Sequence, residues 1–141
     1  IKIVFDFNIR PSRWNKKNLN KFFDSVLKFV DICFLSGEDM NYWKNKNNIK
    51  SYEQVIRKYK IEHSIFRKNA EITYVFLNKL KYIFRNKFIK KVVDTSGAGD
   101  GFNAAYLSNF IVNNDPVLAL KAGSSLGSKI VMKKGAIVDV K

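Results

Sequence analysis

The sequence has few of the residues that build covalent or metal sites. Cysteine and histidine occur once each among its 141 residues, as Cys33 and His63. A single cysteine excludes a disulfide within the chain, and its apolar surroundings in segment 31–35 favour a buried structural thiol over a nucleophile. One histidine without a neighbouring cluster of metal-binding residues argues against a metal-hydrolysis site.

Acidic residues are scarce as well, because 12 Asp and Glu face 26 Lys and Arg, a formal net charge of +14. The lysines are scattered among many Asn, Ile and Phe, as biased A/T-rich coding would produce without a selected basic face. No zinc-finger, RNP-like or basic-zipper pattern organises the charge, so nucleic acid is an unlikely partner, although nonspecific binding to phosphate backbones stays open. The dense stretch 44–50 fits a solvated polar loop.

Long apolar runs are missing too, and none would cross a bilayer. The first residues show no secretory signal, so we expect a cytoplasmic protein that does not bind membranes. Hydrophobic residues make up 46% of the chain, enough for one modest core. No repeat or second domain is evident.

Strand and helix patterns alternate along the first half of the chain. Short β-branched and aromatic segments predict strands, and apolar residues at i, i+3, i+4 spacing predict amphipathic helices. The expected elements are strands at 2–7, 31–35 and 64–67, a helix from Asn15 to Val30, and a helix that begins with a capping box at Ser51–Gln54. This alternation predicts an α/β fold with a mostly parallel sheet and right-handed crossovers.

The second half is expected to contain a hairpin, one further strand and two helices. The hairpin and the strand fall at 72–77, 80–84 and 88–93. In the last helix, Asp115 is the expected N-cap and Pro116 the first helical residue, and the helix runs to about Met132.

The most informative stretch is Val92–Leu107, where a glycine loop is expected to join a strand to a helix. The first N–H groups of a helix lack intrahelical partners and carry the positive end of its dipole, so they bind anions where side chains leave room. The predicted anion hole therefore consists of Gly97, Ala98, Gly99 and Asp100.

Asp100 calls for an explanation of its own, because a carboxylate repels a phosphate. It is positioned to act as a general base that takes a proton from a hydroxyl while that oxygen attacks a bound phosphoryl group. The alternative is an ordinary helix start with an acidic residue in its first turn. Asp94, Thr95 and Ser96 lie just before the loop, where ligands gather in open α/β sheets.

At this point the sequence resembles a known family. Asp94–Phe102 (DTSGAGDGF) matches, without a gap, the second signature of the ribokinase-like (PfkB-type) carbohydrate kinases, DT(T/S)GAGD followed by a small residue and Phe. Phe5–Trp14 is similar to the FDxNxRPxxW stretch of the 2-dehydro-3-deoxygluconokinase branch, and Asp31–Asp39 also looks like that branch. The resemblance implies a three-layer α/β/α fold.

The resemblance runs from about Lys2 to Ile137 and corresponds only to the C-terminal half of a family member. We therefore expect residues 1–141 to be a single partial domain, the nucleotide-binding half, without the N-terminal half and the lid. Such a chain is a fragment, a remnant or an incomplete sequence.

The resemblance assigns roles to residues near the N-terminus. Arg10 is implied to contact a substrate carboxylate, which a guanidinium fork matches bidentately; a solvent-facing turn arginine is the alternative. Asn8 is implied to position Arg10 or to reach nucleotide phosphates, or else it satisfies its own loop. Trp14 is taken as a packing residue.

Further nucleotide contacts are implied by the segment Arg67-Lys68-Asn69, where the family has a (K/R)xG-type turn facing the ATP phosphates. Asn69 replaces the glycine of that turn, and because asparagine tolerates the left-handed conformation, the backbone shape is expected to persist. Gly123-Ser124 and Gly135-Ala136 fall where the family closes the adenine pocket, although small residues also allow close packing.

Metal contacts are implied at three positions. Ser36 and Asp39 stand where many relatives have an NxxE motif that supports the magnesium water shell, with Glu38 as a neighbouring alternative. An ordinary helix entry explains the same residues. Asp94 is implied to border a monovalent-cation loop.

The expected function is ATP- and Mg²⁺-dependent phosphorylation of a sugar acid, 2-dehydro-3-deoxygluconate, to its 6-phosphate. Its expected site residues are Asp100 as base, the 97–100 amides as anion hole and Arg10 as carboxylate clamp. The alternatives are a kinase for a neutral sugar of the fructokinase or ribokinase type and a catalytically inactive nucleotide-binding remnant. A homo-oligomer is left open.

Overall fold

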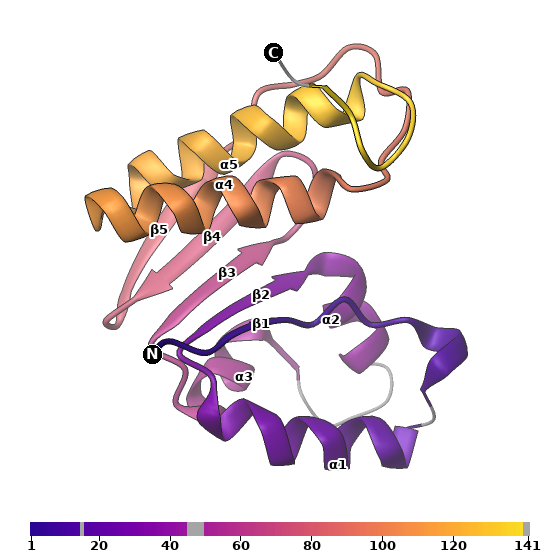
Figure 1. Ribbon diagram of the computed structural model, residues 1–141. Coiled ribbons are helices and arrows are strands. Elements are labelled where there is room, and N and C mark those ends of the chain that lie inside the picture. Colours follow the sequence, from indigo (N-terminus) through magenta and orange to yellow (C-terminus); the bar gives the residue numbers. More distant parts are fainter. Residues whose placement is uncertain (15, 45–49, 140–141) are drawn as a thin grey trace. The chain divides into compact units, whose positions relative to one another are not determined.

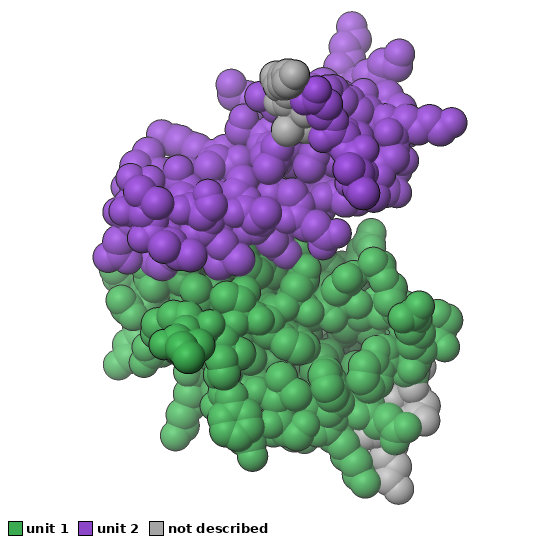
Figure 2. Space-filling model, in the orientation of Figure 1, with its two compact units in different colours: residues 1–83 green, residues 84–141 purple. Residues whose placement is uncertain are grey.

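The computed structural model describes residues 1–14, 16–44 and 50–139. Asn15 of the first predicted helix and most of the predicted polar loop 44–50 lie outside the described residues. The chain divides into two compact units, Ile1–Ile83 and Phe84–Lys141 (Figure 2). The expectation of one partial domain stays a prediction.

The first unit is built on a mixed sheet with the order β1-β2-β3-β4-β5 (Figure 1). Its strands are β1 (Val4–Asp6), β2 (Ile32–Ser36), β3 (His63–Arg67), β4 (Ile72–Leu77) and β5 (Leu80–Arg85). Strands β1, β2 and β3 are parallel, and β4 runs antiparallel to β3. The α/β class and the parallel pairing of the first three strands confirm the sequence-based expectation.

Three helices cover one face of this sheet (Figure 1): α1 (Lys16–Val26), α2 (Gly37–Lys44) and α3 (Tyr52–Tyr59). Two 3₁₀ turns, η1 (Pro11–Arg13) and η2 (Leu27–Phe29), follow β1 and α1. Alternate residues of a strand point to opposite faces, so Cys33 and Leu35 of β2 reach the helices and join the core of this unit. Phe23 and Trp43 pack in the same cluster with ring centroids 4.7 Å apart.

Local sequence signals explain several element ends. The two-residue loop between β4 and β5 has both residues in the left-handed region, Asn78 at φ 50° and Lys79 at φ 70°, which is the type I′ geometry of tight hairpins. The capping box predicted at Ser51 does not form. The Ser51 side chain makes no capping bond, and Gln54 accepts a bond from the backbone N–H of Lys50, one residue before the N-cap, at 2.6 Å.

The second unit consists mainly of α4 (Ala98–Asn113) and α5 (Pro116–Val131), which pack against each other. Asp115 caps α5 as predicted, since its carboxylate accepts bonds from the N–H groups of Val117 at 2.7 Å and Leu118 at 3.0 Å. A Cβ on Gly123 would lie 2.9 Å from the Phe102 carbonyl oxygen, so this glycine allows the close approach of the two helices. The close-packing alternative for Gly123 is thereby supported.

The strand predicted at 88–93 is absent from the structure, which has no strand among the described residues after β5. The N–H groups of Val93 and Asp94 instead donate to the carbonyl oxygen of Val131 at the end of α5, at 2.7 and 3.2 Å. Apolar composition favours a strand only where a neighbouring edge can pair with it.

Cys33 is fully buried, and burial raises the pKa of its thiol, which makes it a structural residue. Within the described part of the chain, no helix combines the length and apolar character needed to cross a bilayer.

Candidate functional site

The glycine loop of the second unit has a backbone that only glycine fits comfortably. Gly97, the residue before α4, has φ 73° and ψ −7°, in the left-handed region. A Cβ at this position would lie 2.6 Å from the carbonyl oxygen of Ala136. The loop is therefore held against the segment that follows α5, and a side chain at residue 97 would displace it.

This geometry leaves backbone N–H groups available at the start of α4. The N–H of Ala98 donates to the Thr95 carbonyl at 3.3 Å and closes the turn. Among the described residues, no acceptor takes the N–H groups of Gly97, Gly99 and Asp100. Three of the four amides of the predicted anion hole are thus free to bind a ligand at the positive end of a 16-residue helix.

Asp100 lies in the first turn of α4, and its side chain is exposed. No described residue donates a hydrogen bond to its carboxylate. A capping aspartate would accept a bond from a nearby backbone N–H, as Asp115 does at α5. Because the carboxylate of Asp100 accepts no hydrogen bond from a described residue, Asp100 is better explained as a residue that acts on a ligand than as a helix cap.

Asp94 stabilises the start of the glycine loop through hydrogen bonds. Its two carboxylate oxygens accept the N–H groups of Ser96 and Gly135, both at 2.9 Å. These backbone bonds lower the pKa of Asp94. The structure thus gives Asp94 a bracing role between the glycine loop and residue 135, and the monovalent-cation role stays a prediction.

In the first unit, the predicted substrate residues follow the carboxyl ends of the parallel strands. Arg10 is exposed and precedes η1, and no described residue accepts a bond from its guanidinium. Asn8, also exposed, follows β1 with φ 36°. Ser36 and Arg67 are paired at the ends of β2 and β3. The register brings these segments to the sheet edge where ligands of α/β proteins bind.

Asp39 connects two of these segments from a buried position, with only 6% of its surface exposed. Its Oδ1 accepts the N–H of Ile9 at 2.6 Å, and its Oδ2 accepts both the N–H and the hydroxyl of Ser36 at 3.0 and 2.6 Å. The residue next to Arg10 is therefore fixed by a carboxylate 30 positions away.

These bonds also bear on metal binding. The carboxylate of Asp39 is occupied by protein donors, so it does not fit as a direct magnesium ligand. No group of three His, Cys, Asp or Glu that could hold a metal ion occurs among the described residues. The water-mediated role of Ser36 and Asp39 stays a prediction.

The turn after β3 differs from the expectation. Asn69 does not enter the left-handed region; its side-chain Oδ1 instead accepts the N–H groups of Glu71 and Ile72 at 3.0 and 2.8 Å. Asparagine stabilises such turns through its side chain, which glycine cannot do. The Asn69 side chain therefore stabilises this turn in place of the expected left-handed residue, and the N–H groups of Glu71 and Ile72 are occupied.

Sequence reasoning missed Gly37, the first residue of α2. A Cβ there would lie 2.1 Å from the Lys68 carbonyl oxygen, so this glycine lets α2 begin against the predicted nucleotide-binding turn. A glycine directly after a buried strand was the available signal.

Comparison with known proteins agrees with this geometry. The family model described as pfkB family carbohydrate kinase matches residues 1–141. A 2-dehydro-3-deoxygluconokinase of Haemophilus influenzae is 29% identical over 98% of this chain and 45% of its own length. A 5-dehydro-2-deoxygluconokinase of Bacillus licheniformis is 29% identical over 94% of this chain and 42% of its own length. The chain thus spans less than half the length of these relatives.

Solved structures share the fold. A fructokinase from Vibrio cholerae, determined with fructose, ADP and calcium ion, has a TM-score of 0.80 at 24% identity, covering 96% of this chain and 46% of that one. A Methanocaldococcus jannaschii nucleoside kinase, described as an archaeal member of the ribokinase family, has a TM-score of 0.76 at 19% identity, covering 96% and 43%. The ribokinase-like α/β fold predicted from the sequence is confirmed. Because the family model matches the chain from end to end, this protein belongs to the pfkB family of carbohydrate kinases.

Proposed function

We propose that this chain is the phosphate-binding and catalytic half of an ATP-dependent kinase for a sugar acid, with 2-dehydro-3-deoxygluconate as substrate. The observation that carries the proposal is the opening of α4, where free amides of the glycine loop and the unoccupied carboxylate of Asp100 lie in the same helical turn. An anion site beside a base is what phosphoryl transfer to a hydroxyl requires.

The reaction proposed here moves one proton and one phosphoryl group. Asp100 accepts the proton of the substrate's 6-hydroxyl while that oxygen attacks the γ-phosphorus of ATP, and the bond to ADP breaks. The N–H groups of Gly97, Gly99 and Asp100 stabilise the negative charge on the phosphoryl oxygens. Magnesium bound to ATP would neutralise phosphate charge.

Arg10 is proposed to select the acidic substrate. Its exposed guanidinium lies beside a backbone that Asp39 fixes through the N–H of Ile9, so its attachment point is well defined. A planar donor fork binds a carboxylate through two parallel bonds, and a neutral sugar offers no such partner. Both curated relatives named above are gluconokinases by name, and a gluconate carries a carboxylate, which supports this choice.

A specificity assay tests the proposal. The chain is joined to an N-terminal half of the length that its relatives possess, and ADP release is measured with 2-dehydro-3-deoxygluconate, fructose and ribose. We expect Arg10→Ala to lower kcat/KM for the sugar acid about 100-fold, the loss of a bidentate charged pair, and to leave neutral sugars unchanged. Arg13→Ala, in the adjacent 3₁₀ turn, is the matched control.

Two outcomes would contradict it. A preference for fructose or ribose in the unaltered protein supports the neutral-sugar alternative. Unchanged discrimination in Arg10→Ala removes Arg10 from the substrate site.

An inactive nucleotide-binding remnant is the second candidate, and the turn at Asn69 favours it. The amides of Glu71 and Ile72, which a glycine at residue 69 would leave open, are occupied by the Asn69 side chain. If the turn limits nucleotide binding, Asn69→Gly raises ATP affinity in equilibrium binding. Measurable ATP turnover by the unaltered protein would eliminate the remnant.

A further inference from the structure

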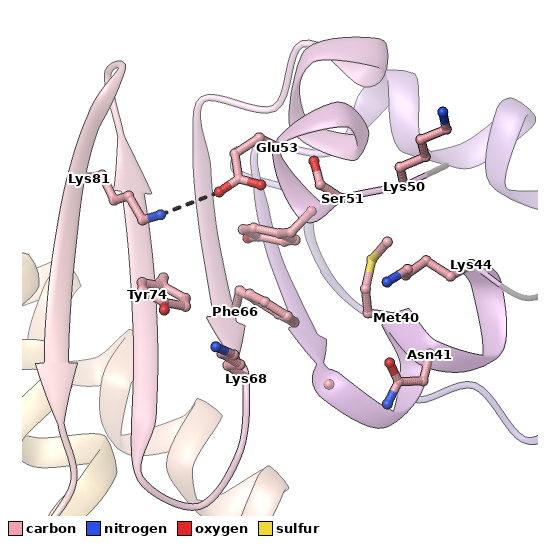
Figure 3. Close-up of a pocket in the computed structure, with 12 residues that line it drawn as sticks. Met40, Asn41, Lys44, Lys50, Ser51, Glu53, Phe66, Lys68, Tyr74 and Lys81 are labelled. Carbon is pink, nitrogen blue, oxygen red and sulfur yellow. Dashed lines mark hydrogen bonds and ion pairs between the residues drawn. The ribbon is translucent and has the colours of Figure 1, made fainter. Parts of the chain in front are cut away.

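A pocket of about 400 Å³ lies within the first unit, on the face of the sheet that the helices cover (Figure 3). One face of α2 forms a wall, because Gly37, Met40, Asn41 and Lys44 recur at helical spacing. The segment 50–53 at the start of α3 forms the opposite wall, and residues of β3, β4 and β5 form the floor. Its volume is within the range of small-molecule sites.

The lining is strongly basic: four lysines against one glutamate. Glu53 is already paired with Lys81 at 3.3 Å. No described acidic group pairs with the ammonium groups of Lys44, Lys50 and Lys68. In Figure 3, Lys44 extends from α2 toward the middle of the pocket. The lining therefore carries unbalanced positive charge, which a multiply charged anion would neutralise.

Aromatic rings form the floor. Tyr52 and Phe66 are stacked with centroids 4.4 Å apart and 20° between their planes, and Phe66 and Tyr74 are nearly parallel at 6.1 Å. The ammonium of Lys81 lies 4.4 Å from the Tyr74 centroid, which holds that lysine at the floor. Aromatic side chains next to charged groups suit a ligand that has both a ring and anionic substituents.

The pocket lies on the opposite face of the sheet from Arg67. The register puts Phe66 opposite Leu35, whose side chain reaches the helical core, and Arg67 is the next residue along β3. Neighbouring residues of a strand point to opposite faces, so Phe66 enters the pocket and Arg67 does not line it. Lys68, the next residue of the turn predicted to bind nucleotide, does line the pocket.

We propose that this pocket binds a small phosphorylated ring compound carrying at least two negative charges, at a site separate from the glycine loop. The lysines of the lining supply the positive charge that attracts its phosphates, with Lys44 directed into the pocket, and Phe66 and Tyr74 border its ring.

Calorimetric titration of the 141-residue chain tests the proposal, with fructose 1,6-bisphosphate as the probe. We expect saturable binding of the bisphosphate that weakens as the salt concentration rises. This binding should be at least tenfold tighter than that of inorganic pyrophosphate, and fructose should show no detectable binding. Lys44→Glu with Lys50→Glu is expected to weaken binding of the bisphosphate at least tenfold. Lys21→Glu with Lys121→Glu changes the net charge equally on exposed positions outside the lining, and is expected to leave the affinity within twofold.

Three results would overturn the proposal. Equal losses in both double variants would show a general charge effect without a site. Equal affinity for pyrophosphate and the bisphosphate would remove the role of the aromatic floor. Unchanged affinity in the Lys44 and Lys50 variant, with both variants folded by circular dichroism, would place any binding elsewhere.

Discussion

Replacement of Gly97 by alanine should damage the glycine loop more than its single added methyl group suggests. At φ 73°, an alanine pays about 1–2 kcal/mol for the left-handed conformation. Its Cβ would also lie 2.6 Å from the Ala136 carbonyl oxygen, and moving backbone to relieve that contact costs about 1–3 kcal/mol more. We expect urea denaturation to show a free energy of unfolding lower by about 2–5 kcal/mol, since these two costs add.

Gly127→Ala is the matched control. Gly127 lies inside α5, and a Cβ there would meet its nearest neighbours at 3.4 and 3.6 Å, an ordinary contact. The same added methyl group should therefore stabilise the chain by about 0.5–1 kcal/mol, because glycine is unfavourable in a helix interior. If both variants unfold at the same urea concentration, the close approach of Gly97 to Ala136 does not hold the loop.

Three further predictions concern other parts of the chain. Lys79→Gly should raise the free energy of unfolding by about 1 kcal/mol in urea titrations, because glycine adopts the left-handed turn at φ 70° without strain; a loss would refute the type I′ turn. Asp39→Asn should lower the free energy of unfolding by about 2–3 kcal/mol, since an amide cannot accept all three hydrogen bonds of this carboxylate. Glu38→Gln, at an exposed neighbouring position, should change it little. Burial lowers the pKa of His63 to about 4, and NMR titration of this single imidazole should show that value. The free energy of unfolding should fall by about 3 kcal/mol as the pH drops from 6.5 to 4, because the unfolded chain binds the proton first. An imidazole pKa of 6.5 would contradict the burial of His63.

The sequence predicted those features that depend on neighbouring residues. The hairpin of β4 and β5 follows from apolar segments around a two-residue turn, and the α5 start follows from Asp115 before Pro116. The glycine loop before a helix was also predicted from neighbouring residues, and the structure shows that Gly97 takes the left-handed conformation before α4.

Features that depend on distant partners were not predictable in this way. The apolar segment 88–93 has the composition of a strand, but its fate depends on whether an edge is available to pair with it. The bond between Asp39 and the N–H of Ile9 could not be predicted, because the two residues lie 30 positions apart in the sequence. Asn69 replaces glycine by a side-chain bond rather than by the same backbone conformation, and residue type alone permits both.

The most direct test of the central claim is single-turnover phosphoryl transfer by Asp100→Asn in the chain joined to an N-terminal half of the length that its relatives possess. Asparagine preserves the shape of the side chain but cannot accept the substrate's proton, so the rate should fall by 10²–10⁴-fold while ATP still binds. Asp115→Asn, which keeps the N-cap of α5, should retain the full rate. A rate for Asp100→Asn close to that of the unaltered protein would contradict the assignment of Asp100 as the catalytic base.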